Sequence, residues 1–249
     1  MITSFTNSLK QIRRDLFHRA FKKKLYPYFE NKTGLEVGGP SRIFSRELPL
    51  YNIAKNIDGC NFSTTTVWEG TIAEGPNYNY CPGKTGYQFI GEASDLRDFE
   101  NNKYDFLLAS HCLEHCANSL KTVEEWLRVI KPGGCLLMIL PGKQYTFDHN
   151  RPVTSFEHLL ADYNNKTDEK DLTHIEEIFR LHDRSMDKDA GTDEDFRTRS
   201  YKNFENRCMH HHVFDFALLE KIYAFFNAEV LAAEFIRPYH QIIAGIKKY

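Results

Sequence analysis

Carboxylates, histidines and glycines of this sequence stand where strand-like segments end. The stretch TGLEVGGPSRIF, residues 33–44, contains Glu36 in an apolar strand-like run that stops at two glycines and a proline. A strand that turns through glycines into a helix commonly holds one end of a nucleotide on backbone amides. The loop formed by Gly38, Gly39 and Pro40 is therefore the first candidate ligand-binding segment.

Two classes of nucleotide ligand are considered for this loop. A dinucleotide is expected to select G-x-G-x-x-G, but Gly38 and Pro40 take the first two places here and Ile43 takes the third. Ile43 disfavours a pyrophosphate, and no Gly-Lys-Ser/Thr of a Walker loop follows. S-adenosylmethionine has no phosphate and carries two cationic groups, so its site should place carboxylates beside the glycines.

Two further carboxylates are expected at neighbouring strand ends. Asp58 ends the strand candidate AKNIDGCNF, where it can accept both ribose hydroxyls. Asp95 ends the candidate YQFIGEASDL, where it can receive the adenine amino group while Leu96 covers the ring. Taken alone, each of these acids is more simply explained as a solvated cap or turn residue than as a ligand contact. Three on successive strand ends favour the cationic, phosphate-free ligand.

Alternating strand and helix patterns must position these residues. Residues 104–110 and 135–141 are near-continuous apolar runs, as buried parallel strands should be. Residues 118–130 are predicted as a helix and residues 42–47 as the start of another. Such alternation predicts an α/β protein with a doubly wound, mostly parallel sheet.

Four segments resemble the ordered motifs of class I S-adenosylmethionine-dependent methyltransferases, in particular the methyltransferase type 11 group: LEVGGP, EASDL, YDFLLASHCLEHCAN and LRVIKPGGCLLMILP. The tail, HHHVFDFALLEKI followed by AEVLAAEF and HQIIAGIKK, is similar to the last helix and antiparallel strand pair of that fold. The LEH followed by LRVIKPGG is the most specific part. The family's E-x-G-x-G-x-G is shortened here to E-V-G-G-P-S, so Pro40 replaces a flexible position.

The resemblance implies a Rossmann-like, seven-stranded sheet with an antiparallel C-terminal strand and a helical insertion after the fifth strand. The resemblance covers residues 31–141 and 208–249, which we predict as the core of one domain over residues 1–249. The residue pattern adds an N-terminal helix within 1–30, and the break in strand–helix alternation after Gly142 predicts an insertion over 142–207.

The resemblance also implies how the cofactor lies. Glu36, Gly38 and Gly39 would line the methionine moiety, and Ser110 with His111 would lie beside the sulfonium and methyl. Asp58 would contact the ribose, and Asp95 and Leu96 the adenine, as expected above.

Catalytic candidates follow the fourth and fifth strands, because ligands of such sheets bind at the carboxyl ends of strands. A hydroxyl acceptor must lose its proton, which a histidine or carboxylate can remove. His111 is one candidate base, and Asp148 with His149 is a carboxylate–imidazole pair that could be another. His111 can equally be a cap residue, and the pair can equally face solvent.

Two histidine-rich segments suggest a metal. HCLEHC, residues 111–116, has ligand spacing but lies inside a methyltransferase motif, so zinc is not expected there. The histidines at 210–212, with Asp148 or Asp215, could hold a divalent cation that assists transfer. Hydrogen bonding is the simpler interpretation, and we predict no metal.

The insertion is predicted to form the acceptor pocket. Seven of the eleven histidines lie between residues 142 and 212, together with several aromatic residues, and such groups suit a polyol. Tyr145, Arg151, His158 and His211 are the candidate acceptor contacts. FDHNRPVTSFEHLLADY resembles a segment of methyltransferases encoded among surface-polysaccharide genes, which implies a sugar or glycan hydroxyl.

Composition and charge limit the kinds of partner that the chain is expected to bind. A formal charge of -2 argues against nucleic acid, and six scattered cysteines suit a reduced, cytoplasmic protein. Residues 10–24 hold seven Lys or Arg. The basic helix they suggest over residues 8–29 is predicted as a lid or packing element, with membrane contact through residues 8–25 as the alternative.

The sequence therefore predicts S-adenosylmethionine-dependent O-methylation of a sugar or glycan. The alternatives are N- or C-methylation of a small metabolite, an inactive methyltransferase-like binding module, and an NAD-linked sugar enzyme, which Ile43 disfavours.

Overall fold

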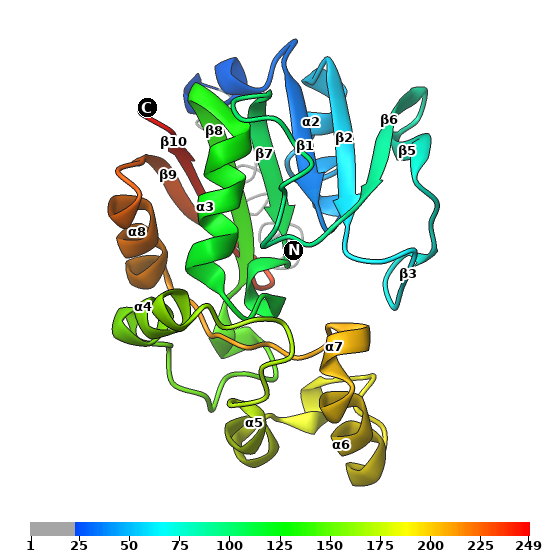
Figure 1. Cartoon of the computed structure of the whole chain (residues 1–249), viewed down its shortest axis with the longest axis vertical. Coiled ribbons are helices and arrows are strands. Elements are labelled where there is room, and N and C mark those ends of the chain that lie inside the picture. The colour runs from blue at the N-terminus through cyan, green and yellow to red at the C-terminus, as the bar shows by residue number, and fades with distance from the viewer. Residues whose placement is uncertain (1–22) are drawn as a thin grey trace, which may run out of the picture.

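The computed structural model describes residues 23–249 (Figure 1). Residues 8–22 of the predicted basic helix, which include most of its predicted membrane contact, therefore lie outside the described residues. The described chain begins with the end of a helix and the 3-10 turn η1 (Tyr26–Tyr28). Among residues 23–249, no helix has the length and apolar content needed to cross a membrane.

The described residues form an eight-stranded central sheet in the order β5-β6-β2-β1-β7-β8-β10-β9. The five strands of its middle part run parallel: β1 (Thr33–Val37), β2 (Asn56–Asn61), β6 (Lys84–Ile90), β7 (Tyr104–Ser110) and β8 (Ile130–Pro141). β9 (Glu229–Ile236) and β10 (His240–Ile246) are antiparallel, as predicted for the tail. Strand order reverses at β1, between β2 and β7, and ligands bind such sheets at this point.

The predicted count of seven strands is wrong by one. Residues 75–81 form β5 (Gly75–Cys81), which pairs antiparallel with β6 and extends the sheet edge. Tyr78 and Tyr80 are its buried residues, and the polar and glycine residues between and before them obscure a strand pattern. A separate two-stranded ribbon, β3 (Thr65–Thr66) with β4 (Gly70–Thr71), precedes it.

Helices cover both faces because alternate strand residues point to opposite sides. In β7, Leu107 and Ala109 join the core under α3 (Ser119–Val129) and α8 (Phe216–Phe225), while Phe106 and Leu108 join the core on the other face. That second face is covered by α2 (Leu50–Ile53) and by η2 (Arg42–Phe44). The helix predicted to begin at residue 42 is thus only a three-residue 3-10 turn.

The segment after β8 forms a helical layer at the carboxyl ends of the parallel strands (Figure 1). Its elements are η4 (Lys143–Tyr145), α4 (Phe156–Asn165), α5 (Ile175–Leu181), η5 (Arg184–Met186), α6 (Asp193–Tyr201) and α7 (Asn203–Asn206). The acidic run at residues 187–195 leads into α6 through a capping box at Thr192.

The two ends of this excursion are joined by hydrogen bonds. The amide of Thr154 donates to the carbonyl of Val213 (2.9 Å), and the amide of Val213 donates to Thr154 Oγ1 (3.0 Å). The chain therefore leaves the sheet after β8 and returns before α8 at a fixed point.

Candidate active site

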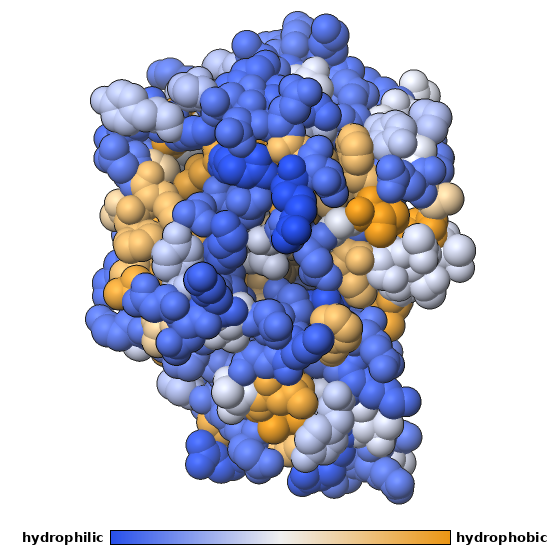
Figure 2. Space-filling model, viewed as in Figure 1, coloured by the Kyte–Doolittle hydropathy of each residue, from blue (hydrophilic) through white to orange (hydrophobic). Residues whose placement is uncertain are grey.

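A cavity of about 510 Å³ opens at the carboxyl ends of β1, β2, β6 and β7. Figure 2 shows a mostly hydrophilic surface with a small hollow near the middle of this face. The wall also includes Trp68 and Glu69 from the segment after β2, and Tyr239 and His240 at the start of β10. The cavity thus lies where the sheet topology predicts a ligand.

The loop after β1 forms one wall of the cavity, and Glu36 contacts this loop on the side away from the cavity. Gly38, with a positive φ of 77°, and Pro40, after a cis peptide bond, line the cavity. Glu36 does not line it. Its fully buried carboxylate accepts hydrogen bonds from Tyr51 Oη (2.5 Å), Tyr78 Oη (2.6 Å) and the amide of Ser41 (3.0 Å). The prediction that Glu36 contacts the ligand is corrected, because burial places it inside the loop.

Gly39 is needed for this loop to close. A Cβ at Gly39 would lie 2.3 Å from the carboxyl group of Glu36 and 2.4 Å from Tyr78 Oη, far inside contact distance. Gly39 is absent from the cavity wall, and its carbonyl accepts a hydrogen bond from Asn61 Nδ2 (2.9 Å). Burial raises the pKa of Glu36, and the hydrogen bonds from the loop and the tyrosines reduce this rise without cancelling it.

The prediction that Asp58 ends its strand is wrong. β2 continues three residues further, to Asn61, and Asn61 lines the cavity. Asp58 lies in mid-strand, where it accepts hydrogen bonds from Tyr104 Oη (3.0 Å) and the amide of Tyr87 (3.0 Å). The carboxylate of Asp58 therefore links strands of the sheet and does not face the cavity.

Asp95 and Leu96 are also displaced from the cavity. Asp95 pairs with the exposed Arg97, and Leu96 is fully buried in the core, with its amide donating to Glu125 Oε2 (3.0 Å). The carboxylate that reaches the cavity after β6 is Glu92. Sequence reasoning chose the wrong acid because the chain turns immediately after β6 ends at Ile90.

Glu92 is joined to the insertion by Arg207. The guanidinium of Arg207 contacts Glu92 Oε1 (2.6 Å) and Glu169 Oε2 (2.8 Å), and all three residues line the cavity. Burial raises the pKa of Glu92, and Arg207 opposes this shift. Neither Arg207 nor Glu169 was predicted, because each is distant in sequence from the strand ends.

Ser110 and His111 line the cavity at the end of β7, as their position in the sequence led us to expect. His111 has a positive φ of 52°, and its amide donates to the carbonyl of Ile139 (2.8 Å). Its Nδ1 lies 3.4 Å from Glu114 Oε1, and its Nε2 lies 2.9 Å from His240 Nδ1. The ring is thus held between a carboxylate and a second imidazole.

Glu114 is a buried anion beneath this ring. Its side chain is 1% exposed. Burial opposes ionisation, but the contacts with His111, His115 and His210 outweigh it and hold the pKa of Glu114 below its usual value. A buried carboxylate beside an imidazole stabilises the protonated ring, which is the arrangement that a general base requires.

Two cavity histidines are neutral at pH 7. Burial lowers the pKa of His115 to about 3, and burial together with His111 lowers the pKa of His240 to about 4. His115 also packs against Trp68, with ring centroids 5.2 Å apart.

These depressed values predict acid lability. Because the unfolded chain protonates histidine near pH 6.5, the stability that comes from keeping His115 and His240 neutral is present above about pH 6.5. It is lost as pH falls toward the folded pKa values of about 3 and about 4. We expect the thermal unfolding midpoint to fall steadily from pH 7 to pH 5, and less steeply in His240→Gln. A midpoint that is constant over this range in the wild type would contradict the assignment.

Asp148, His149 and Arg151 do not line the cavity, so their predicted roles there are corrected. Asp148 is buried between Arg151 Nη1 (2.9 Å) and His210 Nδ1 (2.5 Å). His149 pairs instead with Asp183 near the surface (2.9 Å). The neighbouring Asp148 and His149 thus face different partners, and their pairing in sequence has no counterpart in space.

The remaining predicted acceptor contacts also lie elsewhere. Tyr145 is 45% exposed and packs on Phe235, with ring centroids 5.4 Å apart. His211 is fully buried, with Nε2 3.0 Å from Asn203 Nδ2. His158 belongs to a cluster in the insertion, described below. Of residues 142–207, Glu169 and Arg207 line the cavity.

Sequence reasoning missed aromatic and polar wall residues that lie at the ends of elements or between them: Asn61, Trp68, Glu69, Glu92, His115, Glu169, Arg207, Tyr239 and His240. Only His115 carried a signal, because the LEH segment directly follows the end of β7. The metal suggested for residues 210–212 with Asp148 or Asp215 is not supported, because neither acid belongs to a group of described residues with metal-ligand spacing: Asp215 caps α8, and Asp148 pairs with Arg151 and His210.

Comparison with known proteins gives the class. The family model of a methyltransferase domain matches residues 35–138. An S-adenosylmethionine-dependent methyltransferase from Mesorhizobium loti has a similar structure, with TM-score 0.50 and 11% identity over 92% of this chain and 96% of that one. A second such enzyme, from Aquifex aeolicus, has TM-score 0.48 and 13% identity over 94% and 97% of the two chains. No curated protein matches the sequence.

Residues 35–138 are thus a methyltransferase domain, and the fold is that of methyltransferases. The match over residues 35–138 indicates methyl transfer as the activity, and this class of domain implies S-adenosylmethionine as the cofactor.

Proposed function

We propose that this enzyme transfers the methyl group to a hydroxyl oxygen, and that the hydroxyl belongs to a saccharide. The observation that supports an oxygen acceptor is the His111–Glu114 pair at the end of β7, because a hydroxyl must lose a proton during transfer.

The cavity wall fits a phosphate-free cofactor. The loop after β1 leads into η2, a three-residue turn, and so offers no helix N-terminus to a diphosphate. Four carboxylates of the wall (Glu47, Glu69, Glu92 and Glu169) stand against three arginines (Arg42, Arg46 and Arg207), so the wall has a small excess of negative charge that suits a cationic ligand. We assign Gly38 and Ser41, which line the cavity, to the methionine end, and Asn61 and Glu92 to the nucleoside. When bound, the cofactor supplies a methyl group on a positively charged sulfur.

His111 acts as the base in this proposal. Nδ1 faces Glu114, so Nε2, which contacts His240 Nδ1 in this structure, is the nitrogen that would take the proton of an acceptor hydroxyl placed against it. Glu114 stabilises the imidazolium that results. The neutral ring of His240, beside Nε2, adds no positive charge that would oppose protonation.

Trp68 supports a saccharide as the acceptor. Its indole is 54% exposed at the cavity wall and is backed by His115. An exposed aromatic face with carboxylates nearby suits a sugar, whose apolar face can stack while its hydroxyls donate hydrogen bonds. Glu69 follows Trp68 directly and lines the same wall.

The test is a product analysis. Purified enzyme is incubated with labelled S-adenosylmethionine and separate panels of saccharides, nucleotide-linked sugars and small amines, and products are identified by mass spectrometry. We expect O-methylated saccharide and stoichiometric S-adenosylhomocysteine. Methylation confined to amines or carbon would overturn the proposal, and cofactor binding without turnover on any panel would indicate a binding module.

A matched pair of variants tests the wall. Trp68→Ala removes the cavity indole, whereas Val67→Ala alters a neighbouring residue that is 61% exposed and outside the cavity wall. Loss of one stacking contact of about 1 kcal/mol should raise KM for the saccharide roughly fivefold in the first variant and leave it unchanged in the second. Equal KM values in the two variants would remove Trp68 from the acceptor site.

A further inference from the structure

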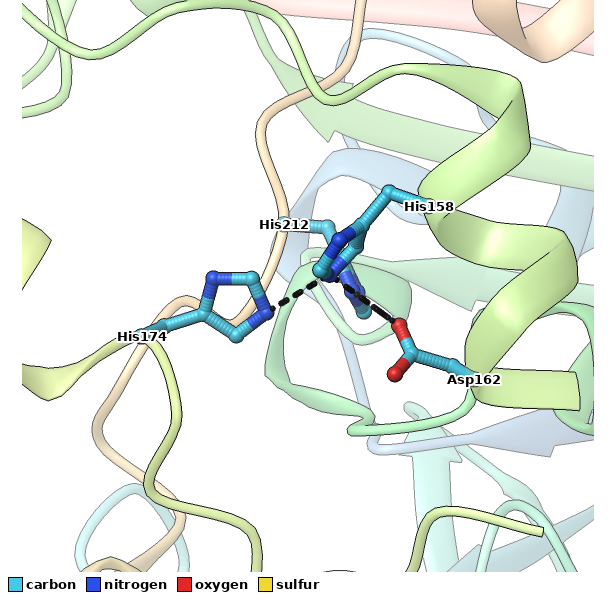
Figure 3. Close-up of side chains that lie close together, drawn as sticks. All are labelled: His158, Asp162, His174 and His212. Carbon is cyan, nitrogen blue, oxygen red and sulfur yellow. Dashed lines mark hydrogen bonds and ion pairs between the residues drawn. The ribbon is translucent and has the colours of Figure 1, made fainter. Parts of the chain in front are cut away.

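Four side chains of the helical insertion and its return segment point toward one common centre (Figure 3). His158 and Asp162 lie one turn apart on α4, His174 precedes α5, and His212 lies in the segment that returns to the core. One ligand atom from each residue lies within 4.8 Å of the others. None of the four lines the cofactor cavity.

The distances between these atoms match a tetrahedral metal site. Nε2 of His158 lies 3.1 Å from Nε2 of His174 and 3.3 Å from Oδ2 of Asp162, and Nε2 of His212 lies 3.1 Å from the same oxygen. Bonds of about 2.0–2.1 Å from a zinc ion to nitrogen or oxygen place tetrahedral ligands roughly 3.3 Å apart. Three edges of the tetrahedron are therefore already formed.

Neighbouring groups orient two of the ligands. Ser119 Oγ on α3 contacts Nδ1 of His212 (3.0 Å), which leaves Nε2 directed at the centre. Thr167 Oγ1 donates to Oδ1 of Asp162 (3.0 Å), which leaves Oδ2 for the same centre. Contacts of this kind on the far side of each ligand are typical of protein metal sites.

Burial suits a structural ion with an entry path. His212 is fully buried and the side chain of Asp162 is 13% exposed, whereas the side chain of His158 is 41% exposed. Three imidazoles and one carboxylate also form the nitrogen-rich, four-ligand set that zinc and related divalent ions prefer.

We propose that His158, Asp162, His174 and His212 bind one first-row divalent transition-metal ion, with zinc as the best fit. All four positions are occupied by protein, so the ion is structural. It fixes α4, the start of α5 and the return segment to one another, and through Ser119 it connects them to α3. The prediction that the chain holds no metal is replaced by this proposal.

Metal content and affinity are the first test. Untagged protein is analysed by elemental mass spectrometry, stripped with a chelator and titrated calorimetrically with Zn²⁺. We expect one ion per chain, with affinity reduced more than roughly 100-fold in His174→Asn and Asp162→Asn, because even outer contacts contribute about 10–100-fold. His149→Asn, which removes a histidine that pairs with Asp183 outside the cluster, should bind zinc as the wild type does. No saturable binding by the wild type would overturn the proposal and leave a hydrogen-bonded histidine cluster.

Two measurements on the wild type avoid dependence on variants that fail to fold. Co²⁺ substitution should give the intense visible bands of a four-coordinate site without a thiolate charge-transfer band. A thiolate band would locate the metal at Cys112 and Cys116 and would contradict the proposal. The unfolding midpoint is compared with free zinc at 100 times its Kd and with zinc removed. We expect the midpoint to be lower by about 5–10 °C without zinc. An unchanged midpoint would show that the ion does not hold the insertion together.

Discussion

Substitution of His111 by asparagine is expected to lower kcat for methyl transfer by about 10²–10⁴, the usual contribution of a general base. Asparagine is chosen because it tolerates the positive φ of 52° at this position, so the backbone at the end of β7 is preserved. Affinity for S-adenosylhomocysteine, measured by calorimetry, should change little, because the proposed role of His111 is to take the acceptor's proton.

The comparison with His149→Asn makes this experiment decisive. His149 is the other histidine that the sequence suggested as a base, but it pairs with Asp183 and does not line the cavity. We expect wild-type kcat in that variant. A loss of activity in His149→Asn that exceeds the loss in His111→Asn would reverse the assignment.

Substitution of Arg151 by methionine is expected to destabilise the protein by about 3–5 kcal/mol, the usual cost of removing one partner from a buried ion pair. Arg151 is 1% exposed, and its guanidinium donates to Asp148, Glu177 and the carbonyls of His210 and His211. Methionine fills similar space but leaves the buried Asp148 carboxylate with only His210. The unfolding midpoint should fall by roughly 6–20 °C in a chain of this size.

A double variant identifies the cause. Adding Asp148→Asn to Arg151→Met removes the uncompensated charge and should restore part of the lost stability, which a double-mutant cycle measures. Arg197→Ala serves as the control, because Arg197 pairs with Asp193 at the surface and such pairs contribute about 0–1 kcal/mol. If Arg151→Met and Arg197→Ala shifted the midpoint equally, the buried network would have no special role.

The sheet could be predicted from the sequence where burial on both faces produced unbroken apolar runs. β7 and residues 135–141 of β8 are such runs, and His111 was found because it directly follows one of them. β2 contains alternating polar residues, so its end at Asn61 could not be read and Asp58 was chosen in error. β5 was missed for the same reason.

Contacts between distant segments account for most of the remaining errors. Two acids follow β6, and only the turn of the backbone decides that Glu92 faces the cavity and Asp95 faces Arg97. Arg207 reaches Glu92 across 115 positions of sequence, a contact that no local pattern encodes. The spacing of His158 and Asp162 on α4 is readable, but their convergence with His174 and His212 depends on tertiary structure.

The paired hydrogen bonds between Thr154 and Val213 have a consequence for how the chain can vary. They close the helical excursion into a loop whose ends stay fixed whatever lies between them. The entropy of closing such a loop grows only with the logarithm of its length, and doubling the length costs about 0.6 kcal/mol. The sheet and its cofactor loop can therefore stay intact while helices between these two residues are lengthened, shortened or exchanged.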